Sequence, residues 1–326
     1  MNQNTKVFLF ALMFSLPFFV GLNFLAEEVE EIAFWREIAN NPEILAAQTI
    51  QQQLEEAVHA ERPILLSSTP KPELYVRSAL SMNVSESGSA KILFTQQPDK
   101  PLAIASLSKL MTALVALKQY PINREIYITK EIVDTEESFG ELRVGDMLTV
   151  QDLLYPLLME SSNDAAAALT SVVGEVAFVD LMNLEAKNLG LFNTLFIDAS
   201  GLDPDPPETS LNLSTSRDLA KLTQHIVETY PQIFDILGLQ QFRLYDARGK
   251  FHHTLTNTNQ LLENNGWPTK VMGGKTGWTP EAKGALILVL ESPKDKGYII
   301  NVVLGSSDRF EDMREMVQWV YTSFRW

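Results

Sequence analysis

The sequence contains no cysteine, and basic residues are scarce. The absence of cysteine excludes disulfide bonds, thiolate nucleophiles and cysteine-based metal sites. Only 26 Lys and Arg residues stand against 41 Asp and Glu residues, which gives a formal net charge of −15 over 326 residues. Recognition of nucleic acid phosphates requires a basic surface, so we expect no nucleic-acid partner.

Histidine is also rare, with four residues in the whole chain. Two of them, His252 and His253, are adjacent, so on a strand their side chains would face opposite sides as exposed groups. The chain has no H-E-x-x-H pattern, which zinc peptidases use to bind their metal. We therefore expect no zinc site.

The N-terminus carries the one long apolar run that approaches membrane length. Residues 7–25 are mostly apolar, Lys6 precedes them and the acidic stretch A-E-E-V-E-E follows. A membrane helix needs about 20 apolar residues, and a basic short end stays on the cytoplasmic side. We predict a membrane anchor over residues 1–26, with the remainder outside the cytoplasm. A cleaved signal peptide ending at Ala26 is the alternative, although Phe24 is large for the position it would occupy.

The next two segments differ in composition. Residues 27–72 are acidic, weakly periodic and end in a proline-rich stretch, which is typical of a stalk and an extended linker. From residue 73 to residue 326 the chain reads as one folded domain. With 45% hydrophobic and 21% charged residues, the chain has the composition of a globular protein.

The pattern within the domain predicts an α+β fold. Strand-like runs surround the turn S-E-S-G-S near residue 87, and a second pair flanks P-K-D-K near residue 294. Between them, residues 107–120 and 149–190 have helical patterns, and an amphipathic helix begins at Arg309. We expect the first and last segments to share one antiparallel sheet, with a helical part inserted between them.

Three short motifs follow one another along the domain. They are S-x-x-K at Ser106 to Lys109, S-x-N at Ser161 to Asn163, and K-T-G at Lys275 to Gly277. Each pattern alone arises readily by chance. Together and in this order they form the signature of class A β-lactamases and penicillin-binding proteins.

The spacing of the first motif distinguishes its two serines. A serine hydroxyl becomes a good nucleophile when a nearby base takes its proton. Residues three apart lie on the same face of a helix, so Lys109 can reach Ser106, whereas Ser108 points about 100° away. Lys109 must be neutral to act as a base, and both burial and the charge of Lys275 would lower its pKa.

The other two motifs add polar groups to the same cleft. Ser161 is expected to pass a proton to the leaving amine, and Asn163 to hold a substrate amide. The glycines around Lys275 and Thr276 indicate that another backbone or a ligand approaches closely, as when a strand edge pairs with an extended peptide. Lys275 and Thr276 would then bind the carboxylate of that peptide.

From about residue 74 onward the chain resembles the serine-type D-alanyl-D-alanine carboxypeptidases among the low-molecular-mass penicillin-binding proteins. Segments such as I-A-S-L-S-K-L-M-T-A-L, M-E-S-S-N-D-A-A-A-A-L, F-I-D-A-S-G-L-D and G-G-K-T-G-W-T-P carry the resemblance. It implies a β-lactamase/transpeptidase-like α+β fold: a five-stranded antiparallel sheet flanked by helices, plus an inserted helical subdomain.

The resemblance also implies an activity. Ser106 would attack the D-Ala-D-Ala bond of a peptidoglycan stem peptide, and β-lactams would acylate the same serine. Ser106 and Trp278 would supply the oxyanion-hole N–H groups, and Arg309 would help bind the terminal carboxylate. The resemblance implies no metal and no organic cofactor. The chain departs from the family pattern at Glu160, where proline is frequent, at Ser162, where glycine is frequent, and at Thr258, where arginine is frequent.

Three other functions fit parts of the sequence. The same site would serve a D,D-endopeptidase that cuts peptidoglycan cross-links. Glu208, in E-T-S-L-N, matches the deacylating glutamate pattern of class A β-lactamases, although its position and the motif S-S-N count against that role. A non-catalytic wall-binding module on a stalk is the third, and the intact motifs count against it.

Overall fold

The computed structural model describes residues 63–66, 69–133, 141–203, 211–263, 266–295 and 297–326. The chain divides into two compact units, Met1–Arg62 and Pro63–Trp326. The predicted anchor, most of the predicted stalk, and Glu208 lie outside the described residues.

Over the described ranges no single helix is long and apolar enough to cross a membrane. One helix pair bent by 95°, Asn163–Thr170 with Glu175–Asn188, meets that test on length and composition only.

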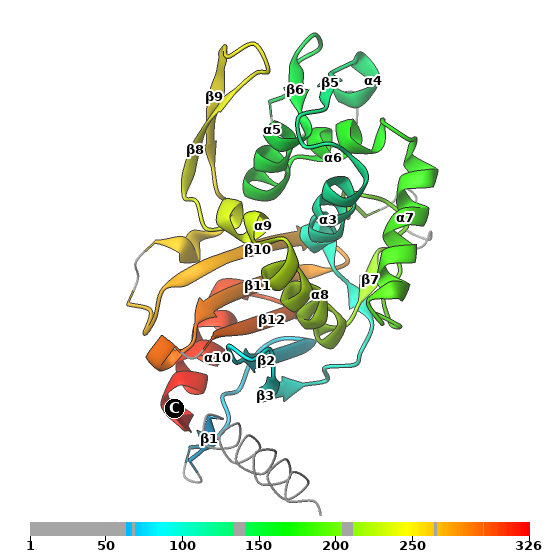
Figure 1. The fold of residues 1–326 in the computed structure, drawn as a ribbon. Coiled ribbons are helices and arrows are strands. Elements are labelled where there is room, and N and C mark those ends of the chain that lie inside the picture. Colours follow the sequence, from blue (N-terminus) through cyan, green and yellow to red (C-terminus); the bar gives the residue numbers. More distant parts are fainter. Residues whose placement is uncertain (1–62, 67–68, 134–140, 204–210, 264–265, 296) are drawn as a thin grey trace, which may run out of the picture. The chain divides into compact units, whose positions relative to one another are not determined.

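A five-stranded antiparallel sheet forms the base of the second unit (Figure 1). Its strands, in spatial order, are β10 (Val271–Thr279), β11 (Lys283–Glu291), β12 (Tyr298–Ser306), β2 (Ser78–Val84) and β3 (Ala90–Gln96). The two strands from the start of the domain therefore pair with the three strands from its end. Both predicted hairpins and the shared sheet are confirmed.

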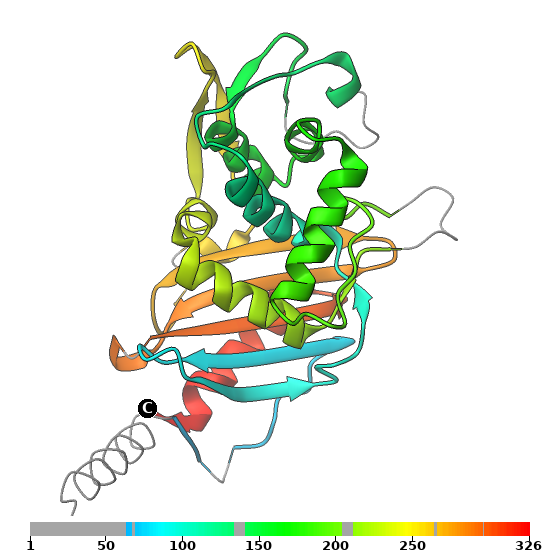
Figure 2. The same cartoon turned by 45° about the vertical axis from the view of Figure 1, so that its right-hand side comes forward.

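Helices cover both faces of this sheet. On one side lie α8 (Ser216–Thr229) and α9 (Pro231–Leu237), and on the other lies α10 (Arg309–Ser323). Figure 2 shows α10 in red behind the strands, while α8 crosses in front of them. The helix predicted from Arg309 onward is confirmed.

The sequence of β11 reflects this double burial. Along a strand, successive side chains point to opposite faces. Leu288 packs in the core cluster that contains Val317 of α10, whereas its neighbour Ile287 packs in the cluster that contains Leu222 of α8. A strand buried on both faces reads as a continuous apolar run, as G-A-L-I-L-V-L does, rather than as an alternating one.

A helical part is inserted between β3 and β10. Its helices are α3 (Lys109–Gln119), α4 (Lys130–Val133), α5 (Val150–Tyr155), α6 (Asn163–Thr170) and α7 (Glu175–Asn188). Two helical turns of other types adjoin them, the 3₁₀ turn η1 (Ala105–Ser108) and the π-helical turn η2 (Pro156–Glu160). Three short strand pairs complete it: β4 (Leu102–Ala103) with β7 (Leu213–Ser214), β5 (Glu125–Tyr127) with β6 (Met147–Thr149), and β8 (Gln241–Tyr245) with β9 (Phe251–Thr256).

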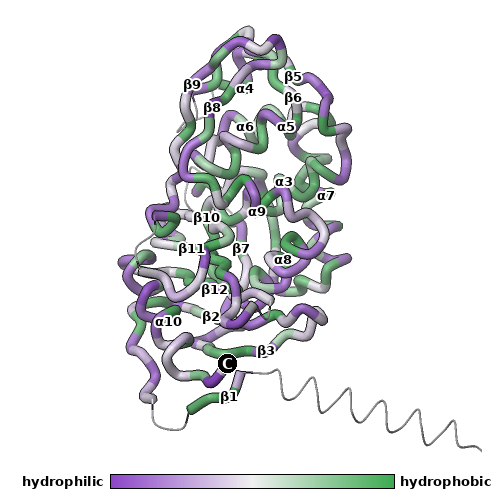
Figure 3. The backbone as a smooth tube through the Cα atoms, turned by 60° about the vertical axis from the view of Figure 1, so that its left-hand side comes forward, coloured by the Kyte–Doolittle hydropathy of each residue, from purple (hydrophilic) through white to green (hydrophobic). Residues whose placement is uncertain are grey.

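The segment that leads into the domain pairs with its last residues. Strand β1 (Ile64–Leu65) is antiparallel to β13 (Phe324–Arg325). It belongs to the stretch predicted as linker, and Figure 3 draws it as a hydrophobic piece of chain. Two further 3₁₀ turns, η3 (Gln260–Leu262) and η4 (Pro293–Asp295), lie in the connections before β10 and before β12.

The edge strand β10 runs along the side of the sheet that faces the helical part (Figure 1). It packs against η1 and α9, so the third motif on β10 and the first motif at η1 meet where the sheet and the helical part adjoin.

Candidate active site

The first motif lies in a tight turn that leads into a buried helix. Ser106 belongs to η1, and Lys109 is the first residue of α3. In a 3₁₀ turn, side chains three residues apart eclipse each other, which aligns Ser106 with Lys109 more closely than an α-helix would. Lys109 Nζ lies 3.1 Å from Ser106 Oγ. The helix that the sequence predicts therefore exists, but Ser106 sits in the 3₁₀ turn before it.

The other serine of this motif is held away from the lysine. Ser108 is completely buried, donates a hydrogen bond to Ala105 O at 2.8 Å and accepts one from Asn212 Nδ2 at 2.8 Å. Its hydroxyl thus fastens η1 to the segment that carries β7. This packing role separates it from Ser106, whose half-buried hydroxyl faces Lys109.

The second motif forms the turn between two helices, as predicted. Ser161 ends η2 with a left-handed backbone (φ +64°), which is uncommon for a residue other than glycine. Ser162 caps α6 by accepting from Ala165 N at 3.1 Å. Asn163, the first residue of α6, accepts from Lys109 Nζ through its Oδ1 at 2.8 Å. The turn therefore joins the second motif directly to the first.

The third motif reaches the second across the site. Lys275 Nζ donates to Ser161 Oγ at 2.9 Å and to Thr276 O at 2.9 Å. Thr276 Oγ1 lies 2.6 Å from Thr258 Oγ1. A family arginine is frequent where Thr258 stands, so here a neutral hydroxyl contacts the K-T-G motif in its place.

The glycines in and before this motif allow other parts of the chain to approach β10 closely, as the sequence suggested. A Cβ atom added to Gly277 would lie 3.1 Å from Ala105 Cβ and 3.2 Å from Ser106 N. One added to Gly274 would lie 2.5 Å from Ile287 O. Strand β10 therefore approaches η1 and β11 closely because it lacks side chains at these two positions.

The electrostatics favour a neutral Lys109. Its side chain is fully buried, and this burial lowers its pKa to about 7, although the negative charge of Asp198 opposes the change. Burial likewise lowers the pKa of Lys275 well below its usual range, and the positive charges of Lys109 and Arg309 lower it further. At neutral pH a substantial fraction of Lys109 is an amine that can take a proton from Ser106.

Arg309 and Trp278 border the same region. Arg309 begins α10, its guanidinium lies 4.6 Å from the Phe310 ring centroid, and its buried Nε has no hydrogen-bond partner among the described residues. The positive charge of Arg309 lowers the pKa of Lys275, so the two side chains interact electrostatically. The Trp278 side chain is 59% exposed, so its ring lies at the rim while its backbone continues β10.

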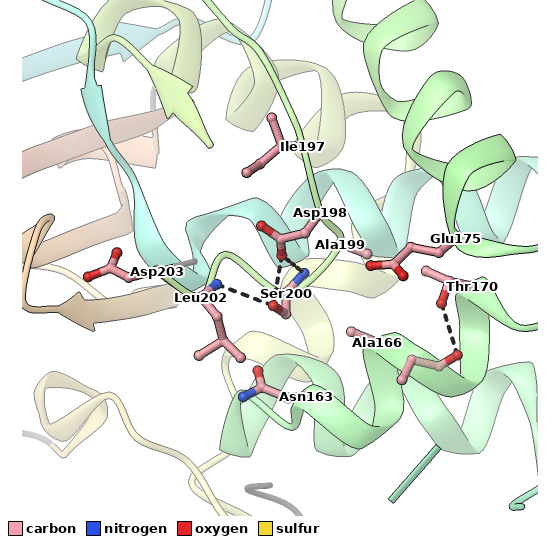
Figure 4. A pocket seen from close by; sticks show the side chains of 11 residues that line it. Asn163, Ala166, Thr170, Glu175, Ile197, Asp198, Ala199, Ser200, Leu202 and Asp203 are labelled. Atoms are coloured by element: carbon pink, nitrogen blue, oxygen red, sulfur yellow. Dashed lines mark hydrogen bonds between the residues drawn. The ribbon is translucent and has the colours of Figure 1, made fainter. Parts of the chain in front are cut away.

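The structure adds a loop to which the sequence analysis gave no role. Ser200 O accepts from Lys109 Nζ at 2.6 Å, and Asp198 Oδ1 accepts from Ser200 N and Gly201 N, each at 2.6 Å. Figure 4 shows Asp198 and Ser200 beside a cavity of about 400 Å³ that Asn163 also lines. The signal was present in D-A-S-G, because an aspartate that accepts from the backbone two and three residues later is typical of a turn.

The prediction for the two adjacent histidines is wrong. His252 and His253 are largely buried, with side chains 4% and 12% exposed, and their rings lie 4.8 Å apart. The register of β8 with β9 shifts between Leu244 and Tyr245, which leaves His252 as an extra residue in the ladder. Such a bulge redirects side chains, so the strict alternation of a regular strand does not apply. Over the described residues no group of three or more His, Asp or Glu side chains is arranged to hold a metal ion.

Comparison with known proteins adds independent findings. Residues 67–308 match the model of the S11 peptidase family, described as D-alanyl-D-alanine carboxypeptidase. A D-alanyl-D-alanine endopeptidase of Pseudomonas aeruginosa is 30% identical over 273 residues, which cover 82% of this chain and 84% of that protein. The carboxypeptidase DacC of Escherichia coli is 31% identical over 254 residues, 72% of this chain and 59% of that protein. The solved structure of the Streptomyces K15 DD-transpeptidase is similar with a TM-score of 0.68 and 29% identity, covering 78% of this chain and all of that one.

Proposed function

Because the chain belongs to the S11 family of D-alanyl-D-alanine carboxypeptidases, we propose that Ser106 is its acylated nucleophile and Lys109 the base that activates it. The protein is a serine-type D-alanyl-D-alanine carboxypeptidase, a hydrolase that acts on peptidoglycan stem peptides and binds β-lactams. The observation that carries the residue assignment is the 3.1 Å contact between Ser106 Oγ and a buried Lys109 whose pKa is lowered to about 7.

The reaction follows from this geometry. Neutral Lys109 takes the proton of Ser106 as the hydroxyl oxygen attacks the carbonyl carbon of the penultimate D-alanine. The N–H groups of Ser106 and Trp278 stabilise the negative oxygen of the tetrahedral intermediate. The C–N bond then breaks, and the proton held by Lys109 is relayed to the departing amine through the Ser161 hydroxyl, which gains one proton as it gives one up and accepts a hydrogen bond from Lys275. Water attacks the resulting ester and releases the shortened peptide, which restores the Ser106 hydroxyl.

Substrate binding uses the sheet side of the site. An extended peptide pairs with the edge of β10, and Asn163 holds one of its amides. The C-terminal carboxylate lies near Lys275, Thr276 and Arg309, whose buried Nε has no partner within the described chain. The positive charge of the Arg309 guanidinium and the N–H groups of Lys275 complement the negative charge of the substrate terminus.

The adjacent serines of the first motif provide the test. Ser106→Ala should abolish D-alanine release from a pentapeptide and labelling by fluorescent penicillin, while the fold remains intact by circular dichroism. Ser108→Ala, the matched control, removes hydrogen bonds in the core and should lower stability, yet the remaining folded protein should still be labelled. Retained labelling in Ser106→Ala would disprove the assignment.

Endopeptidase action on cross-links is the second candidate. The Pseudomonas aeruginosa relative, which matches this chain over 84% of its own length, is named an endopeptidase, whereas DacC is matched over 59%. Both reactions proceed through the same acyl-enzyme. Mass spectrometry of digested wall fragments separates them, because a carboxypeptidase removes one D-alanine and an endopeptidase splits a cross-linked dimer.

Location at the cytoplasmic membrane is part of the proposal. The apolar run at residues 7–25, with Lys6 before it and acidic residues after it, supports a single-pass anchor and a catalytic domain on the extracytoplasmic face. Expression of the full chain followed by fractionation should place it with membranes, resistant to extraction by high salt. Release of a shortened, soluble product would indicate a cleaved signal peptide instead.

A further inference from the structure

A row of four titratable side chains leads to the second motif from outside the site. His252 Nε2 lies 2.8 Å from Asp146 Oδ2, and His252 Nδ1 lies 2.6 Å from His253 Nδ1. His253 Nε2 in turn lies 3.2 Å from Glu160 Oε2. Glu160 directly precedes Ser161 in the chain. The row thus connects the residue before β6, strand β9 and the end of η2.

Glu160 fastens the S-S-N turn to the β8–β9 hairpin. Its second carboxylate oxygen, Oε1, accepts from Thr256 N at 3.2 Å, and Thr258 N donates to Met159 O at 3.0 Å. These bonds join the end of η2 to the chain that leaves β9. Ser161 adopts its uncommon left-handed backbone at this attachment point.

The three contacts of the row require three protons. A carboxylate only accepts, so each histidine Nε2 must carry a hydrogen. The contact between the two Nδ1 atoms needs one more hydrogen, because two lone pairs at 2.6 Å repel. A neutral imidazole carries a single N–H, so two neutral rings supply two protons where three are needed.

We propose that His252 and His253 together hold one additional proton, and that this charged pair, through Glu160, positions Ser161. The second half of the inference rests on the proposed role of Ser161 in proton transfer. Glu160 and His253 are positioning residues, since their contacts lead to the turn and not to substrate. Without the additional proton, one contact lacks its hydrogen and the attachment of the turn to β9 loosens.

The groups around the pair are consistent with one bound positive charge. Asp146 and Glu160 face it from two other elements, and Leu244, the residue opposite His253 on β8, is uncharged. Two other charged side chains of the hairpin have partners of their own. Asp246 accepts from backbone N–H groups of its own turn, and the Arg243 guanidinium stacks on the Phe251 ring at 5.0 Å.

Substitution of Glu160 by glutamine gives a sharp test of the proton count. The amide oxygen still accepts from Thr256 N, and the amide N–H now donates to His253 Nε2. All contacts are then satisfied by two neutral rings, so Glu160→Gln should keep the geometry and remove the additional proton. Ring ¹⁵N NMR of histidine-labelled full-length protein at pH 7.5 should show one doubly protonated ring in the wild type and none in the variant. His252→Gln, His253→Gln and His225→Gln assign the signals, His225 being a histidine on α8 outside the row.

Activity measurements test the positioning role separately. Glu160→Ala removes both attachments and should slow penicillin labelling of Ser106 about tenfold or more, within the range that a small misplacement costs. Glu160→Gln should restore the wild-type rate at pH 7, because both attachments remain. Two neutral rings in the wild type, or an unchanged NMR signature in Glu160→Gln, would overturn the proton assignment. Wild-type labelling by a folded Glu160→Ala protein would overturn the positioning role. Neither NMR outcome depends on which bond the enzyme cleaves, so failure of the proposed function remains distinguishable.

Discussion

The two walls of the site are built by different means. The sheet wall is strand β10, where regular alternation sets the direction of each side chain and glycines permit close approach to η1 and β11. The helical wall holds Ser106 and Ser161 in irregular backbone. Ala105 and Ser161 have φ angles of +48° and +64°, and η2 is a π-helical turn. Tertiary contacts must compensate such backbone, since it costs on the order of 1–3 kcal/mol at each such residue.

This difference assigns the two walls separate tasks. In the proposed mechanism the irregular wall carries the groups that move protons, Ser106, Lys109 and Ser161, whereas the regular wall carries Lys275 and Thr276, which would bind and orient the substrate. A helical turn that departs from ideal geometry can direct a side chain where a regular helix cannot. Changes on the helical wall should therefore affect the chemical step most.

The largest effect is expected from Lys109, at the centre of the helical wall. Lys109→Met keeps the apolar length of the side chain but removes the base, so acylation by penicillin should fall about 1,000-fold. Stopped-flow or gel-based labelling measures the rate. Lys118→Met, on the same helix as Lys109, is the control: it breaks the ion pair with the buried Glu185 of α7 and should lower stability, but the folded protein should label normally. Near-normal labelling of Lys109→Met would remove the lysine from the mechanism.

The next effect concerns Ser161 and its neighbour. Ser161→Ala removes the hydroxyl that Lys275 contacts and should slow D-alanine release about 100-fold. Ser162→Ala removes only the cap of α6, which should cost about 1 kcal/mol in the free energy of unfolding and leave catalysis nearly unchanged. Equal kinetic losses in the two variants would show that the turn as a whole matters, rather than the Ser161 hydroxyl.

A smaller effect is expected on the sheet wall. Gly277→Ala places a methyl group 3.1 Å from Ala105 Cβ, so β10 and η1 must separate slightly. We expect labelling of Ser106 to fall about tenfold through misplacement, with little change in secondary structure. Gly174→Ala, where a Cβ would meet no atom within 4 Å, reports the backbone cost alone. A loss as large as that of Lys109→Met would contradict the division of tasks between the walls.

The pH dependence of penicillin labelling tests the role of Lys109, and we expect the labelling rate to change a few-fold. If neutral Lys109 is the base, as proposed, labelling should rise with pH and level off above about pH 7. The same group contributes to stability with a defined sign. Between pH 7 and its ordinary pKa of 10.5 the unfolded chain binds more protons at Lys109 than the folded chain does, so stability rises with pH there. Denaturant titrations at several pH values should show this slope, and Lys109→Met should flatten it.

The smallest effect is expected from Glu208. If the enzyme is not a class A-like β-lactamase, Glu208→Gln should leave the slow turnover of a bound penicillin unchanged. Hydrolysis of nitrocefin and the lifetime of the labelled species measure that turnover. Rapid turnover that disappears in Glu208→Gln would instead assign the deacylating role to this residue.

The sequence by itself determined the sheet wall and most of the topology. The strand-like runs on either side of P-K-D-K predicted the hairpin of β11 and β12, and the glycines flanking Lys275 predicted close approach, because both depend on local chemistry. The spacing of Ser106 and Lys109 selected the serine that contacts the lysine.

Only the tertiary structure decided how the helical wall is held. The 3₁₀ turn at Ser106, the left-handed Ser161 and the contact of Lys109 with Ser200 O depend on partners distant in the chain. The bulge that brings His252 against His253 depends on the register of two strands, which alternation along one strand does not encode. Local preferences are small, so long-range packing sets the backbone wherever the two disagree.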